Sequence, residues 1–99
     1  MTGTGNRITI TVKSFATLRE VVDAEVRMDL GEGATIRSLL AGLTEQYKGL
    51  SDQLFSAPGT LRDFVNILKN GRNIYFLAGL DTPLENGDTI ALFPPAAGG

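Results

Sequence analysis

The sequence contains neither cysteine nor histidine. Without cysteine there can be no disulfide, no thiolate nucleophile and no thiolate ligand for a metal. Without histidine there is no imidazole to act as a base or as a metal ligand. Most enzyme classes therefore lose their main catalytic groups. If this chain carries sulfur or an acyl group, a side-chain thiol cannot hold it, which leaves the C-terminal carboxyl group.

Long apolar runs and clusters of like charge are also missing. No apolar run approaches the ~20 residues that a membrane span needs, and residues 1–6 lack the basic and apolar regions of a signal peptide. Nine basic and eleven acidic residues give a net charge of −2 and form no basic run, which disfavours nucleic-acid binding. We expect one cytoplasmic domain that binds neither nucleic acid nor membrane, because 99 residues suffice for a single core.

The first third of the chain predicts two strands. Residues 7–13 alternate strictly, with Ile8, Ile10 and Val12 on one face, which is typical of a half-buried strand. Residues 15–22 form an irregular or short helical connection, and residues 25–30 alternate again as an antiparallel partner. Charges on the outer face of this second strand indicate either a solvated surface or an edge protected against aggregation.

One main helix follows. Thr35 is placed to cap a helix that runs to Gly49. Beyond it, residues 50–55 are expected to meander beneath the helix, and residues 57–60 to form a turn. The helix has apolar residues at helical spacing, which predicts one buried face: Ile36, Leu39, Leu40, Leu43 and Tyr47.

Three more strands are predicted in the last third. Asn70 and Gly71 suit a type I′ turn, so residues 64–69 and 72–76 should form a hairpin. Residues 78–88 are expected to form a loop, and residues 89–93 a closing strand. The order of elements predicts an α+β domain with one main helix packed on one face of a mixed sheet.

The end of the chain carries the strongest functional signal. Pro94 and Pro95 restrict the backbone to extended geometry, and Gly98 and Gly99 allow another backbone to approach closely because they have no Cβ. The alternative is an ordinary frayed end, in which small residues are common. We expect a disordered leader at residues 1–6, a domain at 7–93 and an extended, flexible C-terminal tail at 94–99. Its reactive atom would belong to the Gly99 carboxylate.

Four stretches resemble the MoaD family of ubiquitin-like sulfur carriers, which the small archaeal modifier proteins closely resemble. They are residues 15–20, 65–72, 84–88 and, most specifically, 91–99, with the sequence ALFPPAAGG. The resemblance covers residues 7–99. It implies a single β-grasp (ubiquitin-like) domain with the first and last strands side by side in the middle of the sheet.

Strand parity predicts a partner surface near the tail. If Ile90 and Leu92 face the helix, the alternate residues face away from it, and the same reasoning applies to residues 64–68. If the two strands are neighbours, as the resemblance implies, they form an exposed sheet-face patch, which usually marks a partner site; the alternative is scattered surface apolar residues. Together with the tail residues Pro94, Pro95, Ala96 and Ala97, the partner-binding residues would be Phe64, Leu68, Ala91 and Phe93.

A free carboxylate is a poor acyl donor, so Gly99 would need an activating enzyme that uses ATP to form an acyl adenylate. The chain itself would bind no cofactor tightly. Sulfur transfer to the adenylate would give a thiocarboxylate. The MoaD resemblance implies that this thiocarboxylate donates its sulfur in the large subunit of molybdopterin synthase. Attack by a lysine of a target protein would give an isopeptide bond, as the resemblance to small archaeal modifiers implies. Both fates stay open, and on its own the chain is expected to be a monomer.

Two other classes of function remain to be weighed. In a passive protein-binding module, the sheet face would dock a partner and the tail would take no part. In an enzyme, Asp81 and Glu85 would be the best acid–base pair, but they lie in a turn-rich segment where solvated carboxylates are common. We therefore expect no catalytic residues in this chain and no metal site.

Overall fold

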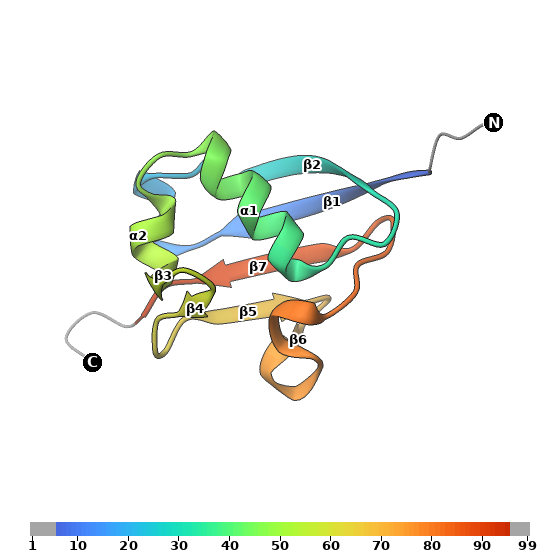
Figure 1. The fold of residues 1–99 in the computed structure, drawn as a ribbon. Helices are drawn as coiled ribbons and strands as arrows, with labels where there is room; N and C mark the ends of the chain where they lie inside the picture. The colour runs from blue at the N-terminus through green and yellow to red at the C-terminus, as the bar shows by residue number, and fades with distance from the viewer. Residues whose placement is uncertain (1–5, 96–99) are drawn as a thin grey trace.

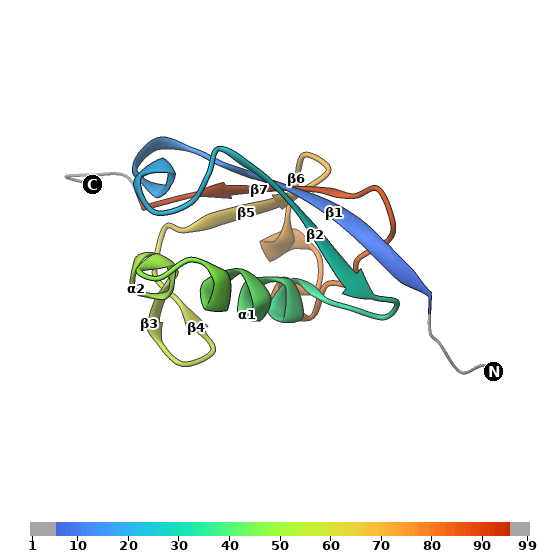
Figure 2. The ribbon, with the colours of Figure 1, turned by 90° about the horizontal axis from the view of Figure 1, so that it is seen from above.

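A five-stranded mixed sheet packs against helix α1 in the computed structural model, which describes residues 6–95 (Figure 1). The two layers are seen from above in Figure 2. The elements in chain order are β1 (Arg7–Ser14), η1 (Ala16–Glu20), β2 (Glu25–Gly31), α1 (Ile36–Gln46), α2 (Leu50–Leu54), β3 (Phe55–Ala57), β4 (Thr60–Leu61), β5 (Asn66–Lys69), β6 (Arg72–Asn73), η2 (Ile74–Phe76), η3 (Gly79–Asp81) and β7 (Thr89–Phe93).

The sheet has the order β2-β1-β7-β5-β6, so the first and last strands lie side by side at its centre. β1 and β7 are parallel, and every other pairing in this sheet is antiparallel. This arrangement confirms the β-grasp expectation. β3 and β4 form a separate two-stranded hairpin.

The core lies between the inner face of the sheet and α1. Alternate residues of the central strands are fully buried, as the period of two predicts: Ile10, Val12, Ile90 and Leu92. The facing stripe of α1 is also fully buried and consists of Ile36, Leu39, Leu40 and Leu43. A fully buried aliphatic side chain contributes roughly 1.5–3 kcal/mol, so these residues supply much of the stability.

The start of α1 is defined by a capping box. The Ser38 amide donates to the Thr35 hydroxyl at 3.4 Å, and the Thr35 amide donates to the Ser38 hydroxyl at 2.7 Å. Two amides that the first turn would leave unpaired are thereby satisfied. The predicted cap at Thr35 is confirmed.

Several sequence predictions about local structure were wrong. Helix α1 ends at Gln46 and not at Gly49, and β5 begins at Asn66 and not at Phe64. Residues 50–54 form helix α2 instead of a meander, because Leu50 and Leu54, one turn apart, are both fully buried. The strand predicted at 72–76 ends at Asn73, whose side-chain oxygen accepts from the Tyr75 amide and starts the turn η2. The hairpin turn itself is confirmed, since Asn70 and Gly71 both have positive φ angles, 50° and 86°.

Candidate functional site: the root of the C-terminal tail

Strand β7 delivers the chain to the root of the predicted tail. Its Ile90 and Leu92 are fully buried, and Ala91 is paired with Lys13 of β1 on one side and Leu68 of β5 on the other. The predicted tail therefore follows a strand in the middle of the sheet. Phe93, Pro94 and Pro95 are each half-buried. Four predicted site residues, Ala96, Ala97, Gly98 and Gly99, lie outside the described residues.

An aromatic stack stands at this root. The rings of Phe15 and Phe93 lie parallel, with centroids 4.5 Å apart. The Arg19 guanidinium lies 5.4 Å from the centroid of Phe15, and its Nε donates to the Ser14 carbonyl at 3.0 Å. Sequence reasoning placed Phe93 on the outer face but missed Phe15 and Arg19 as its neighbours. The spacing of four between Phe15 and Arg19 is the only signal that the sequence offers.

The predicted sheet-face patch is only partly contiguous. Leu68 and Ala91 are direct neighbours on β5 and β7, and both are half-buried. Phe64 is 79% exposed, lies before β5 and has a positive φ of 70°. The polar residue opposite Phe93 is Asn66, which lies between Phe64 and Leu68 in sequence. The structure thus places three of the four residues on neighbouring positions, with Phe64 outside the strand register; their use by a partner stays a prediction.

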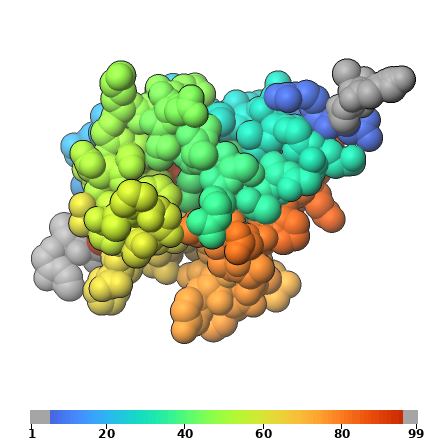
Figure 3. Space-filling view, viewed as in Figure 1, coloured from blue at the N-terminus to red at the C-terminus, as the bar shows by residue number. Residues whose placement is uncertain are grey.

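A second apolar surface was not predicted. Tyr75 and Phe76 are 81% and 76% exposed, and their rings meet edge to face with centroids 5.2 Å apart. They belong to the segment from β6 through η3, which projects in orange from the lower margin of the molecule in Figure 3. The sequence pattern suggested a strand here, so both aromatic residues were interpreted as hairpin positions.

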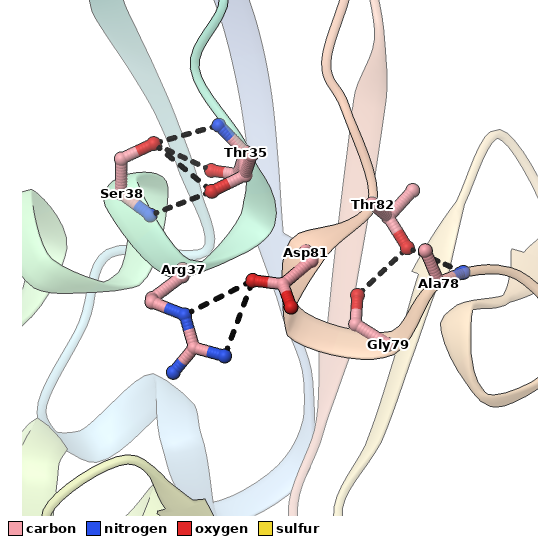
Figure 4. A network of polar contacts seen from close by, with 7 residues as sticks. All are labelled: Thr35, Arg37, Ser38, Ala78, Gly79, Asp81 and Thr82. Atoms are coloured by element: carbon pink, nitrogen blue, oxygen red, sulfur yellow. Dashed lines mark hydrogen bonds and ion pairs between the residues drawn. The ribbon is translucent and has the colours of Figure 1, made fainter.

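Asp81 and Glu85, the acid–base candidates of the sequence, lie in separate local contacts in the described part of the chain. No group of three or more acidic residues within 6–95 is arranged to bind a metal ion. Asp81 forms an exposed ion pair with Arg37, whose Nη2 lies 3.2 Å from Asp81 Oδ1, and so joins η3 to α1 (Figure 4). Glu85 is exposed, and its amide donates to the Asp88 carboxylate at 2.8 Å. These contacts link neighbouring elements of the fold and do not bring the carboxylates of Asp81 and Glu85 together as a pair.

Two hollows lie on the surface of the described residues. The smaller, of about 380 Å³, lies at Pro95 and is lined also by Leu61, Arg62 and Asp63. The larger, of about 570 Å³, lies between α1, α2 and the β3–β4 hairpin, with Arg37 and Phe55 in its wall. Only the smaller hollow includes a residue of the predicted tail. Among the described residues no helix is long and apolar enough to cross a membrane.

The parallel pairing of β1 with β7 beneath a crossing helix defines a ubiquitin-like β-grasp protein, with its last strand leading into the C-terminal segment. The chain belongs to the ThiS family, which it matches over residues 12–99.

Curated relatives include both carriers and modifiers. The chain is 39% identical over 89 residues to small archaeal modifier protein 3 of Haloferax volcanii, covering 89% of this chain and 96% of the relative. It is 38% identical over 69 residues to the sulfur carrier protein CysO of Mycobacterium tuberculosis, covering 68% of this chain and 74% of the relative.

Solved structures agree. The crystal structure of small archaeal modifier protein 1 from Haloferax volcanii superposes with a TM-score of 0.80 at 34% identity, covering 90% of this chain and 99% of that one. A chain of the BexX/CysO complex from Amycolatopsis orientalis superposes with a TM-score of 0.74 at 26% identity, covering 91% and 99%. The chain is therefore a ubiquitin-like sulfur carrier or small protein modifier of the ThiS and MoaD group, and not an enzyme.

Proposed function

We propose that the Gly99 carboxylate is the reactive group and that an ATP-dependent enzyme activates it. The carboxylate oxygen attacks the α-phosphate of ATP, pyrophosphate leaves, and an acyl adenylate forms at Gly99. Resonance stabilises a free carboxylate against nucleophiles, whereas AMP is a good leaving group. ATP thus belongs to the activating enzyme, and this chain is its protein substrate.

Two fates of the adenylate follow from the attacking atom. Attack by sulfide releases AMP and leaves a thiocarboxylate, which can donate sulfur in a partner enzyme such as the large subunit of molybdopterin synthase. Attack by a lysine amine of a target protein releases AMP and leaves an isopeptide bond. Relatives named as a sulfur carrier and as a small modifier support keeping both fates for this chain.

The observation that carries the proposal is the position of β7. Its buried Ile90 and Leu92 anchor the strand between β1 and β5, and the next residues are Phe93 and the Pro94–Pro95 step. Proline fixes φ, so residues 94–99 should extend away from this anchor as a tail, with residues 1–6 as a leader of no assigned role. Gly98 and Gly99 would pass through a narrow channel in the partner because they have no Cβ.

The partner is proposed to dock around the root of the tail, on Phe93, Ala91, Leu68 and Phe64 together with residues 94–97. The described apolar residues there are half-buried or exposed, so contact with a partner would remove apolar surface from water. The relative CysO is found in a complex with BexX, which supports a docking role for this fold. Because activation consumes ATP, we place the protein in the cytoplasm.

The test is AMP transfer from α-labelled ATP by a matching activating enzyme. The full chain should become labelled, and a chain lacking Gly99 should not, while both give the same circular dichroism spectrum. Labelling that survives deletion of Gly99 would exclude its carboxylate as the site. Labelling of neither chain, with binding to the enzyme retained, would favour the passive binding module.

Mass spectrometry of protein from the native host separates the two fates. Replacement of one oxygen by sulfur at Gly99 identifies a carrier, and a Gly-Gly remnant on lysines of other proteins identifies a modifier. Both signals together identify a chain that serves both uses.

A further inference from the structure

Strand β2 is a long, regular strand at the edge of the main sheet. It pairs with β1 over seven consecutive residues without a bulge, and no described residue pairs with its other side. Figure 2 looks down on this edge. Proteins usually protect such an edge with a proline, a bulge, a charge pointing inward or charged side chains along the strand. β2 has only the last of these, on its outer face, since its inward residues are Val26, Met28 and Leu30.

The backbone amides and carbonyls of the odd-numbered residues of β2 face the open edge and are free to pair. The Thr9 amide donates to the Asn86 side chain at 2.8 Å, and the Thr9 carbonyl accepts from the Gly87 amide at 2.9 Å. The backbone polar groups of Thr9 therefore face away from β2. In an antiparallel pair, the residue opposite such a position also faces outward. Asp29, opposite Thr9, and Arg27, two residues before it, thus present their amides and carbonyls to the open edge.

We propose that two copies of this chain pair through β2, antiparallel and about a two-fold axis at Met28. In this register Arg27 of each copy lies opposite Asp29 of the other, and these are the residues whose amides and carbonyls face the edge. Val26 lies opposite Leu30 on the helix side, and Met28 lies opposite its own copy. The pairing therefore joins two opposite-charge pairs on the outer face and an apolar row on the inner face.

The charge pattern selects this register over its neighbours. A shift of two residues in one direction places Arg27 opposite Arg27 and Glu25 opposite Asp29. A shift of two in the other direction places Asp29 opposite Asp29. Both put like charges directly across from each other, which is destabilising. A shift of one residue would put the inner row of one copy on the same face as the outer row of the other, and would oppose residues whose amides face the edge to residues whose amides face β1.

Two existing contacts involve Asp29 at this edge. The Thr9 hydroxyl donates to the Asp29 carboxylate Oδ1 at 2.9 Å, which leaves Oδ2 for Arg27 of a second copy. The Arg7 guanidinium Nη2 donates to the Asp29 carbonyl at 2.9 Å, and both residues are exposed. A carbonyl oxygen has two lone pairs, so it can keep this contact and also accept from the Arg27 amide of the second copy. The contact also shows that the Asp29 carbonyl is open to donors from outside the sheet.

Pairing through β2 is independent of the proposed function. β1 separates β2 from β7, so both tail roots stay accessible in the pair. The inference replaces the expectation of a lone monomer, which treated the charges of β2 only as protection of the edge. Their arrangement disfavours the shifted registers while matching a second copy of the same strand in the proposed register.

Charge reversal tests the proposal by sedimentation equilibrium of the full chain over a range of concentrations. The native chain should dimerise reversibly. Arg27→Asp alone and Asp29→Arg alone each replace two attractive pairs with two repulsive ones, so each should weaken dimerisation at least about tenfold. An equimolar mixture of the two variants, and the double variant, should both regain dimerisation because every facing pair is again of opposite charge.

The matched control is Glu25→Arg, which makes the same charge change as Asp29→Arg on the same strand. In the proposed register Glu25 faces Gly31, so this change should leave dimerisation nearly unaltered. A native chain that stays monomeric up to its solubility limit would overturn the proposal. Dimerisation that resists both single reversals, or that the mixture does not restore, would also overturn it.

Cross-linking tests the register directly, because the chain has no cysteine of its own. Met28→Cys should form an inter-chain disulfide under mild oxidation, since directly opposite residues of a non-hydrogen-bonded pair lie close together. Thr60→Cys on β4 is an exposed control remote from this edge and should form no inter-chain disulfide under the same conditions. Equal cross-linking of the two variants would exclude the β2 register.

Discussion

The ring of Phe93 lies almost parallel to the ring of Phe15, with their planes inclined by only 7° and their centroids 4.5 Å apart. This contact ties the last residue of β7 to the residue that follows β1, at the point where the proposed tail begins. A stacked aromatic pair is worth about 0.5–1.5 kcal/mol beyond the burial of its area. The stack therefore holds the start of the tail in one place while leaving part of both rings accessible.

Substitutions in this stack should separate stability from docking. Phe15→Ala should lower the free energy of unfolding by about 1–2 kcal/mol, because it removes the stacked partner of Phe93 but no fully buried side chain. Phe93→Glu should weaken binding of the activating enzyme more than it lowers stability. Urea unfolding and a binding titration measure the two effects. If Phe93→Glu unfolds the domain, Phe93 is a core residue and its docking role is wrong.

The Asp88 carboxylate should be the most stabilising acidic group in the described part of the chain. It is 6% exposed, accepts from Asn70 Nδ2 and the Glu85 amide at 2.8 Å each, and lies 3.6 Å from Lys69 Nζ. Asp88→Ala leaves these donors unpaired and should cost about 2–4 kcal/mol in thermal or urea unfolding.

The control for Asp88 is the exposed ion pair between Arg37 and Asp81. The side chains of this pair are 53% and 73% exposed, so water and salt screen the charges. Asp81→Asn should change the free energy of unfolding by less than about 0.5 kcal/mol. Equal losses for Asp88→Ala and Asp81→Asn would show that the Asp88 network contributes little.

Removing the Ser14 hydroxyl should stabilise the domain. Ser14 is fully buried, and its Oγ has no hydrogen-bond partner among the described residues. An unpaired buried hydroxyl costs about 1–3 kcal/mol, so Ser14→Ala should raise the midpoint of urea unfolding by an amount equal to about 1 kcal/mol. A lower midpoint would show that the hydroxyl is satisfied, for example by an internal water.

Tyr47 should make stability fall in alkali. The pKa of Tyr47 is raised, mainly by burial. The negative charge of Asp23 and the hydrogen bond that the Tyr47 hydroxyl donates to the Asp23 carboxylate at 3.2 Å raise it further. A raised pKa favours the neutral phenol in the folded state. The contribution of Tyr47 to the free energy of unfolding is therefore complete below its unfolded pKa of about 10, and it is lost as the pH rises through its pKa in the folded state. In Tyr47→Phe this part of the pH dependence should disappear. Unchanged alkaline unfolding of Tyr47→Phe would contradict the assignment.

Gly98 should matter for activation and not for folding. Gly98→Trp adds a bulky side chain next to the proposed reactive end, where a narrow channel in the enzyme would exclude it. AMP transfer should be lost, and circular dichroism and the unfolding midpoint should be unchanged. Unfolding of Gly98→Trp would show that this end packs into the domain.

Local patterns predicted the elements that depend on neighbours in sequence. The alternation of Ile8, Ile10 and Val12 identified β1, Thr35 marked the start of α1, and Asn70–Gly71 identified the hairpin turn. Each of these signals joins residues no more than four positions apart. Helix α2 was missed because a five-residue helix is too short for a recognisable period; burial of Leu50 and Leu54 stabilises it.

In the candidate site, too, local patterns were predicted and contacts between distant residues were not. Parity along β7 correctly placed Ile90 and Leu92 inside, but the register of β5 against β7 put Asn66 opposite Phe93 and left Phe64 outside the strand. The stack of Phe15 on Phe93 joins residues 78 positions apart, since 93 − 15 = 78. No periodic pattern spans that distance, so sequence reasoning could not pair them.

The sequence by itself determined the absence of thiol and imidazole side chains, the alternating strands, the capped helix and the pair of glycines at positions 98 and 99, because each depends on residue type or on spacing within a few positions. Only the tertiary structure decided which strands are neighbours, which aromatic rings meet at the tail root and which edge of the sheet is open. Those features depend on contacts between residues far apart in the chain, and such contacts exist only after the core has packed.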